Sequence, residues 1–214
     1  MDERRERRSV STGKGDDGTT GLLYAQRRVF KDDAMTEACG AIDEAVAALG
    51  LVRADVNDRA AEGRLPASLV TWPELLLRFQ RELFVAGAQL ATPPEAADRL
   101  EPGRTAVSAA MVAGLEKLLT EAEASVGAPT EFVVPGETRL SAAVEAARTA
   151  VRRAERRAVT VARVQHRVDD SAGDQLIPYL NRLADLLWIL ARVAERADLR
   201  APVPANEPQH RRNR

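Results

Sequence analysis

The residues best suited to chemistry lie in one arginine-rich stretch, 147–156, which reads Ala-Arg-Thr-Ala-Val-Arg-Arg-Ala-Glu-Arg. It belongs to a segment, about 139–162, that contains no Pro or Gly and is predicted to be helical. Residues three or four apart share a helix face, so Arg148, Arg152 and Glu155 are expected to form one row. Two or three guanidinium groups beside one carboxylate are a candidate anion site. The alternative is a solvated helix face with ion pairs.

A stripe of small apolar residues runs beside this row on the same predicted helix. Its members are Val144, Ala147, Val151, Ala154 and Ala158. Small side chains let a partner helix approach closely, so the arginine row is expected at a packed seam between helices. The composition agrees, because hydrophobic residues make up 45% of the chain and aromatic residues only 4%, which is typical of a helical core of Ala, Leu and Val.

A glycine-rich polar stretch, 11–20, is a second candidate for binding phosphate. Gly13 and Gly18 have the spacing of the P-loop motif, but Thr19 stands where that motif needs lysine, and no hydrophobic strand precedes the stretch. Closely spaced backbone N–H groups can still form an anion-binding concavity. A flexible hinge explains the same residues equally well.

Metal and nucleophilic chemistry have little support among the side chains. Cys39, His166 and His210 are the only cysteine and histidines, so a zinc site cannot be assembled from Cys and His. A single cysteine excludes an internal disulfide and suits a reducing cytoplasm. The net charge of −1 argues against general affinity for nucleic acid or acidic membranes, although arginines are concentrated at both ends of the chain.

Five helices are predicted from hydrophobic periodicity and from the positions of Pro and Gly. They cover about 34–52, 72–90, the segment from a cap at Thr105 to about 126, 139–162 and 175–197. We therefore expect an all-α, five-helix up-and-down bundle at 11–199, with disordered tails at 1–10 and 200–214 that binding does not need. The most apolar run, 183–194, is interrupted by charges, so no membrane span is expected. The charged first residues do not resemble a signal peptide.

Six ordered blocks of the sequence resemble the PduO-type ATP:cob(I)alamin adenosyltransferases. The blocks are 12–20 (Thr-Gly-Lys-Gly-Asp-Asp-Gly-Thr-Thr), 28–33 (Arg-Val-Phe-Lys-Asp-Asp), 37–44 (Glu-Ala-Cys-Gly-Ala-Ile-Asp-Glu), 132–136 (Phe-Val-Val-Pro-Gly), 147–156, and 179–187 (Tyr-Leu-Asn-Arg-Leu-Ala-Asp-Leu-Leu). Together they cover roughly 9–197, and six blocks in order are far more specific than any one of them. The resemblance favours a substrate site over a solvated ion-pair face.

The resemblance also implies roles for individual residues. ATP would be held by Thr12, Gly13, Lys14, Gly15, Thr20, Gly21, Lys31, Arg152, Arg153, Glu155, Arg156 and Asn181. Close to the corrin ring, Arg148 would pair with Asp43, and Phe132 would press on the lower face of the cobalt. These three residues and Arg152 would form the catalytic set.

The implied reaction transfers the 5′-deoxyadenosyl group of ATP to the cobalt of cob(I)alamin, which releases triphosphate and forms adenosylcobalamin. Cobalt(I) is itself the nucleophile, so Arg, Lys, backbone N–H groups and a bound Mg²⁺ need only stabilise the charge on the leaving group. The family resemblance implies a cytoplasmic homotrimer with each site between subunits. It also implies a flavoprotein reductase and an adenosylcobalamin-dependent mutase as partners, and neither nucleic acid nor a membrane.

The sequence departs from the family pattern in four places. Lys14 replaces a threonine, Glu137 a glycine and Val46 an asparagine, and Val144-Glu145 stands where a histidine is usual. These changes spare the other residues assigned to ATP and bear on corrinoid affinity. Two functions of other classes stay open: a non-catalytic carrier of adenosylcobalamin, and a helical scaffold or nucleic-acid binder. An intact triphosphate site favours the enzyme.

Overall fold

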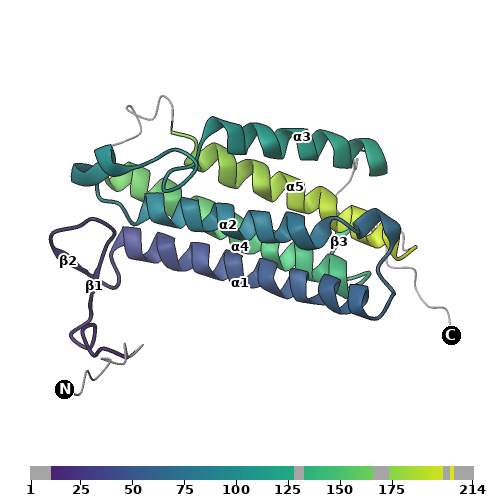
Figure 1. The fold of residues 1–214 in the computed structure, drawn as a ribbon, viewed down its shortest axis with the longest axis horizontal. Coiled ribbons are helices and arrows are strands. Elements are labelled where there is room, and N and C mark those ends of the chain that lie inside the picture. The colour runs from purple at the N-terminus through teal and green to yellow at the C-terminus, as the bar shows by residue number, and fades with distance from the viewer. Residues whose placement is uncertain (1–10, 128–132, 166–173, 200–202, 205–214) are drawn as a thin grey trace, which may run out of the picture.

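The computed structural model describes residues 11–127, 133–165, 174–199 and 203–204. In these parts of the chain five long helices lie side by side (Figure 1): α1 Ala34–Ala61, α2 Trp72–Leu90, α3 Ala109–Val126, α4 Arg139–Val164 and α5 Leu176–Ala197. Two short 3-10 helices, η1 Ala67–Leu69 and η2 Pro94–Arg99, lie in the loops on either side of α2. The predicted all-α bundle is confirmed.

Helix α3 packs mainly against α5, and less against α2, its neighbour in sequence. In the described residues α1 packs on α2 and α4, and α5 packs on α4 and α3. Arg182 Nε of α5 donates to Glu116 Oε1 of α3 (3.4 Å), and Arg196 Nη1 donates to the Ser125 carbonyl (2.7 Å). Because both residue numbers increase together, α3 and α5 run parallel. The long link 91–108, which contains η2, allows α3 to cross over to this position.

Three helix ends differ from the prediction. Helix α1 continues past Val52 to Ala61, because the next residue that favours a turn is Gly63, with a φ of +66°. Helix α3 begins later than the predicted cap at Thr105, because the Ser108 side chain accepts from a backbone N–H of the first turn and caps the helix there. Helix α4 extends two residues beyond its predicted end, to Val164.

Two small antiparallel strand pairs were not predicted. Strand β1 Thr19–Gly21 pairs with β2 Arg28–Phe30, directly after the glycine-rich loop. Strand β3 Val133–Val134 pairs with β4 Val203–Pro204. Two residues of the predicted C-terminal tail, 203–204, thus form β4. The predicted tail at 1–10 and the rest of 200–214 lie outside the described residues.

The core consists of the predicted apolar stripes. The five residues of the small apolar stripe on α4 are all buried, as are the leucines of α5 at positions 176, 180, 183, 187 and 190. Burial of a leucine-sized side chain stabilises the fold by about 1.5–3 kcal/mol, so these stripes hold α4 in place. None of the described helices is long and apolar enough to cross a membrane.

Candidate functional site

The predicted arginine row lies on the side of α4 that faces α5 and α3. Arg148 and Arg152 line one cleft of about 460 Å³. The rest of its wall comes from α3 and α5: Leu119, Glu123, Ala184, Asp185, Trp188 and Ile189. A cleft with guanidinium groups on one wall, and both apolar side chains and two carboxylates on the other, suits a ligand that has both polar and apolar parts.

Arg148 is the more constrained of the two arginines. Its Nε donates to Glu145 Oε2 (2.6 Å), and its side chain is 24% exposed. Among the described residues no ion pair joins Arg148 to Asp43, which is exposed on α1. The pairing implied by the family resemblance is therefore not made within one copy of the chain.

Glu155 and Asn181 come together across α4 and α5. Asn181 Nδ2 donates to Glu155 Oε1 (3.3 Å). Glu155 lies about one helical turn beyond Arg152, on the same side of α4. Arg156, one position round the helix, donates from Nη1 to the Arg152 carbonyl (3.2 Å). The structure thus brings four of the residues predicted to hold ATP close together.

Arg153 lies on the other side of α4, against α1. It forms an ion pair with Glu44, and Arg157 forms a second pair with Glu37 Oε1 (3.1 Å). All four side chains are about half exposed, and such surface pairs contribute no more than about 1 kcal/mol. The structure therefore separates Arg153 from Arg148 and Arg152, although the sequence places all three in one block.

The glycine-rich loop has a defined turn conformation. Gly18 N donates to the Gly15 carbonyl (3.1 Å). Arg28 Nη2 donates to the carbonyl oxygens of Lys14 (2.7 Å) and Thr19 (2.9 Å), so strand β2 holds the loop from its far side. These bonds favour a preformed binding loop over a flexible hinge.

Lys31 reaches over this loop at Gly15. A Cβ at Gly15 would lie 3.0 Å from Lys31 Nζ and 3.2 Å from the Thr19 carbonyl oxygen, so any other residue would displace the lysine from this position. Gly13 and Gly18 have φ values of +67° and +79°, which glycine adopts without strain. The remaining residues predicted for the loop lie in the same turn or in β1: Thr12, Lys14, Thr20 and Gly21.

The loop and the cleft do not meet within one copy of the chain. Strands β1 and β2 lie beyond the N-terminal end of α1 (Figure 1). In the described residues no hydrogen bond or ion pair joins 11–31 to Arg148, Arg152, Glu155 or Asn181. Seven of the twelve residues predicted to hold ATP are thus on a separate part of the molecule.

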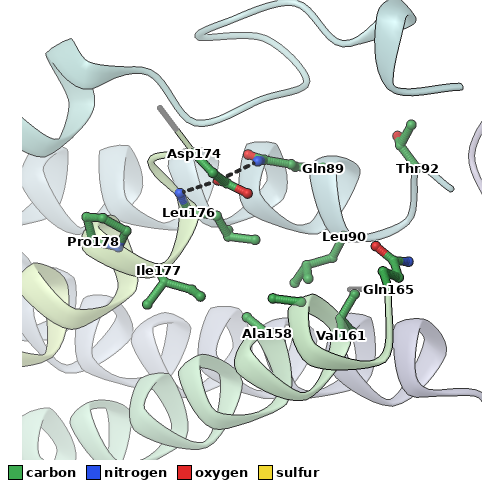
Figure 2. Close-up of a pocket in the computed structure, with 11 residues that line it drawn as sticks. Gln89, Leu90, Thr92, Ala158, Val161, Gln165, Asp174, Leu176, Ile177 and Pro178 are labelled. Atoms are coloured by element: carbon green, nitrogen blue, oxygen red, sulfur yellow. Dashed lines mark hydrogen bonds between the residues drawn. The ribbon is translucent and has the colours of Figure 1, made fainter. Parts of the chain in front are cut away.

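Figure 2 shows a second cavity, of about 280 Å³, between the end of α4 and the start of α5. Leu90, Val161 and Ile177 contribute apolar walls, and Gln89 Nε2 donates to Asp174 Oδ1 (2.9 Å) at the rim. No residue predicted to hold ATP or corrinoid lines it. Phe132, predicted to face the cobalt, lies outside the described residues.

Sequence reasoning missed two residues of the cleft region. Trp188 lines the cleft but was not singled out, although it follows Asn181 by seven residues and so shares its helix face. Glu145 was noted only as a departure from a family pattern. Its position three residues before Arg148 was the signal that the two side chains would meet.

An arginine-lined cleft and a separate glycine-rich loop on a helical bundle are features suited to the binding of a large anionic ligand. The model for the family "Cobalamin adenosyltransferase" matches residues 10–194. This chain belongs to that family.

Its relatives include proteins of known structure. The chain is 40% identical over 187 residues to a corrinoid adenosyltransferase of Mycobacterium tuberculosis strain ATCC 25618 / H37Rv, covering 86% of this chain and 88% of the relative. It is 34% identical over 186 residues to one of Citrobacter freundii, covering 87% and 94%. A variant PduO-type ATP:corrinoid adenosyltransferase of Lactobacillus reuteri, solved with cobalamin and ATP, superimposes with a TM-score of 0.75 at 25% identity, covering 93% of this chain and 97% of the other.

Proposed function

We propose that the protein is an ATP:cob(I)alamin adenosyltransferase, which transfers the 5′-deoxyadenosyl group of ATP to cobalt and releases triphosphate. The observation that carries this proposal is the cleft between α4 and α5, where Arg148 and Arg152 lie opposite Trp188. Family membership supports the same reaction. The cleft also offers cations for a polyphosphate and, in Trp188 and Ile189, apolar surface for a large ring.

The side chains suit a reaction in which the substrate supplies the nucleophile. Cobalt(I) attacks C5′ of ATP, the C5′–O bond breaks, and the electron pair leaves on the triphosphate. Arg152, Lys31 and the loop N–H groups would stabilise that developing negative charge, since preorganised donors act most strongly on charge that appears in the transition state. No described residue needs to act as a covalent nucleophile.

A complete site would form between two copies of the chain. The loop and the cleft do not meet in one copy, so we propose a homotrimer in which the loop of one protomer faces the cleft of the next. In the same arrangement Asp43 of one copy would reach Arg148 of its neighbour.

A mixing experiment tests the shared site. Lys31→Ala damages the loop and Arg152→Ala the cleft, so each variant alone should lose most of its activity. Co-expressed at equal levels, the two should regain about a quarter of the wild-type activity, because random assembly leaves that share of sites with both halves intact. No recovery in mixed oligomers would place the whole site within one protomer.

Two further features belong to the proposal. Mg²⁺ would arrive bound to the triphosphate, because the described residues contain no cluster of three or more His, Cys, Asp or Glu side chains able to hold a metal. Phe132 would cover the lower face of the cobalt and keep water away from it. The Phe132→Ala protein should then lose the four-coordinate cob(II)alamin signal in electron paramagnetic resonance while still binding ATP.

The decisive experiment is anaerobic incubation with ATP and chemically reduced cobalamin. We expect the absorbance of base-off adenosylcobalamin to appear, together with one triphosphate per turnover. Tight binding of finished adenosylcobalamin without turnover would instead identify a carrier. We further propose that the enzyme works in the cytoplasm with a flavoprotein reductase as electron donor and passes its product to a dependent mutase.

A further inference from the structure

Four charged side chains form a buried chain between α4 and α5. Glu145 and Arg148 come from α4, and Arg192 and Glu195 come from α5. Glu145 and Arg192 are 4% exposed and Glu195 is 1% exposed, so three of the four are almost completely removed from water. Only Arg148 reaches the cleft. The charges balance within the group.

Glu145 is the residue that links the group to the cleft. Its Oε2 accepts from Arg148 Nε (2.6 Å), and its Oε1 lies 3.3 Å from Arg192 Nη2. Arg192 Nη2 also donates to Glu195 Oε1 (2.7 Å). Both oxygens of Glu145 are therefore engaged, one with the arginine of the cleft and the other with an arginine fixed on the neighbouring helix.

This group of buried charges is expected to contribute little to the stability of the fold. Burying ions costs several kcal/mol each, and the attraction between them offsets that cost only when every polar atom has a partner. Here Arg192 Nε and Arg192 Nη1 are buried without a hydrogen-bond partner among the described residues. Burial also raises the pKa of Glu195, against the opposing effect of Arg192. Stability therefore does not explain why these charged residues lie between α4 and α5, and a functional role explains it better.

We propose that Glu145 is a positioning residue, which holds Arg148 by its Nε and leaves Nη1 and Nη2 for the group that Arg148 meets in the cleft. This inference rests on the proposed function, because it assumes that Arg148 acts on the corrinoid side of the site. Among the described residues Nη1 and Nη2 have no protein partner, whereas Nε is bonded to a buried carboxylate. Arg192 in turn fixes Glu145, so α5 sets the position of an arginine on α4.

The test replaces the carboxylate by its neutral isostere in the full-length protein. Glu145→Gln should lower kcat/KM for cob(I)alamin by about ten- to a hundredfold, because small displacements of a positioning group have effects of this size. The KM for ATP should stay within about twofold, since the loop lies elsewhere. Val161→Ala, a buried change on the same helix more than three turns beyond Arg148, is the control for general destabilisation and should leave both values unchanged.

A double-mutant cycle separates positioning from a structural role. If Glu145 acts only through Arg148, then Glu145→Gln added to Arg148→Ala should cause no further loss for cob(I)alamin. Full additivity of the two losses, or an unchanged kcat/KM in Glu145→Gln, would overturn the inference while leaving the proposed function intact. An Arg148→Ala enzyme with normal cob(I)alamin kinetics would instead remove Arg148 from the proposed site, and the inference with it.

Glu145→Asp carries the same test if the glutamine variant does not fold. It keeps the charge that neutralises Arg192 but is one methylene too short to hold both arginines at the observed distances. We expect a folded protein with the same selective loss for cob(I)alamin. Wild-type cob(I)alamin kinetics in a folded Glu145→Asp protein would contradict the proposal.

Discussion

Arg152 differs from Arg148 in having its side chain free for a ligand. In the described residues its guanidinium has no carboxylate partner, and the one side chain bonded to Arg152, that of Arg156, contacts its backbone carbonyl. Such an exposed cation contributes little to folding. Its position in the cleft is therefore best explained by a ligand, which makes it the clearest target at the scale of single residues.

The first prediction concerns this residue. Arg152→Ala should weaken ATP binding or turnover by about one to two orders of magnitude, because hydrogen bonds to charged groups contribute about 1.5–3 kcal/mol. Steady-state kinetics with varied ATP give this value. The melting temperature without ATP should hardly change, and a large fall in melting temperature with normal kinetics would make Arg152 structural.

Cys39 offers a prediction about pH. Burial and the nearby charge of Asp43 raise the pKa of the thiol to about 11. The folded value lies above the unfolded one, so the thiol's contribution to stability is complete below the unfolded pKa and is lost as pH rises through about 11. Near neutral pH the folded protein therefore holds Cys39 as an inert thiol.

Alkylation with iodoacetamide tests whether the Cys39 thiol is protonated and unreactive in the folded protein. At pH 8 a thiol with a normal pKa near 8.5 is roughly one quarter thiolate, while Cys39 in the folded protein should be about a hundredfold or more less ionised. Modification followed by mass spectrometry should be at least that much slower in the native protein than in urea. Equal rates in both states would show that α1 and α2 do not shield the thiol.

At the scale of elements, the loop before β1 depends on the absence of a side chain at Gly15. Gly15→Ala places a methyl group against Lys31, which must move aside. Losing part of a charged hydrogen bond costs about 1 kcal/mol, so the KM for ATP should rise about fivefold. Gly87→Ala, whose methyl would make an ordinary 3.5 Å contact with Ile42, is the matched control and should leave that KM unchanged.

Helices were predictable from the sequence because their signals repeat. The leucines of α5 recur at three- and four-residue spacings, and α2 begins and ends where its Pro and its apolar stripe indicate. The strands β1 and β2 carry no such signal, since three residues are too few for an alternating pattern. The parallel packing of α3 on α5 could not be predicted either, because the link 91–108 is long enough for α3 to pack against more than one helix.

The site was predictable to the extent that it lies on one helix. Helical spacing placed Arg148, Arg152 and Glu155 on one side of α4, and the structure agrees. Spacing could not reveal that Arg153, the residue after Arg152, points toward α1 and forms an ion pair with Glu44. Nor could it reveal Arg192, because that contact depends on how α4 and α5 align.

At the scale of the whole molecule, strand β4 ties the C-terminal part of the chain to the segment that follows Phe132. A chain that ends at residue 204 keeps β4, and one that ends at residue 200 lacks it. Backbone hydrogen bonds contribute about 0.5–1.5 kcal/mol each, so the shorter chain should bind corrinoid about two- to tenfold more weakly.

Binding measurements on the two truncated proteins decide this point. ATP affinity should be unchanged in both, as should both affinities in a chain that lacks residues 1–8. Equal corrinoid affinity in the two C-terminal truncations would mean that the β3–β4 pair is dispensable for the site.

The parallel packing of α3 on α5 has a consequence for how the protein is made. Helices α1 and α2 can pair as soon as Leu90 has left the ribosome, but α3 must wait for α5, the last helix to be synthesised. Until then Met111, Val112 and Leu115, which are buried in the finished protein, lack the cover that α5 provides. Exposed apolar surface of this kind promotes aggregation during synthesis. Messenger RNAs that end before the codon for Leu176 should therefore yield insoluble proteins that depend on chaperones. Deletion of the glycine-rich loop, 11–20, should instead leave a soluble bundle.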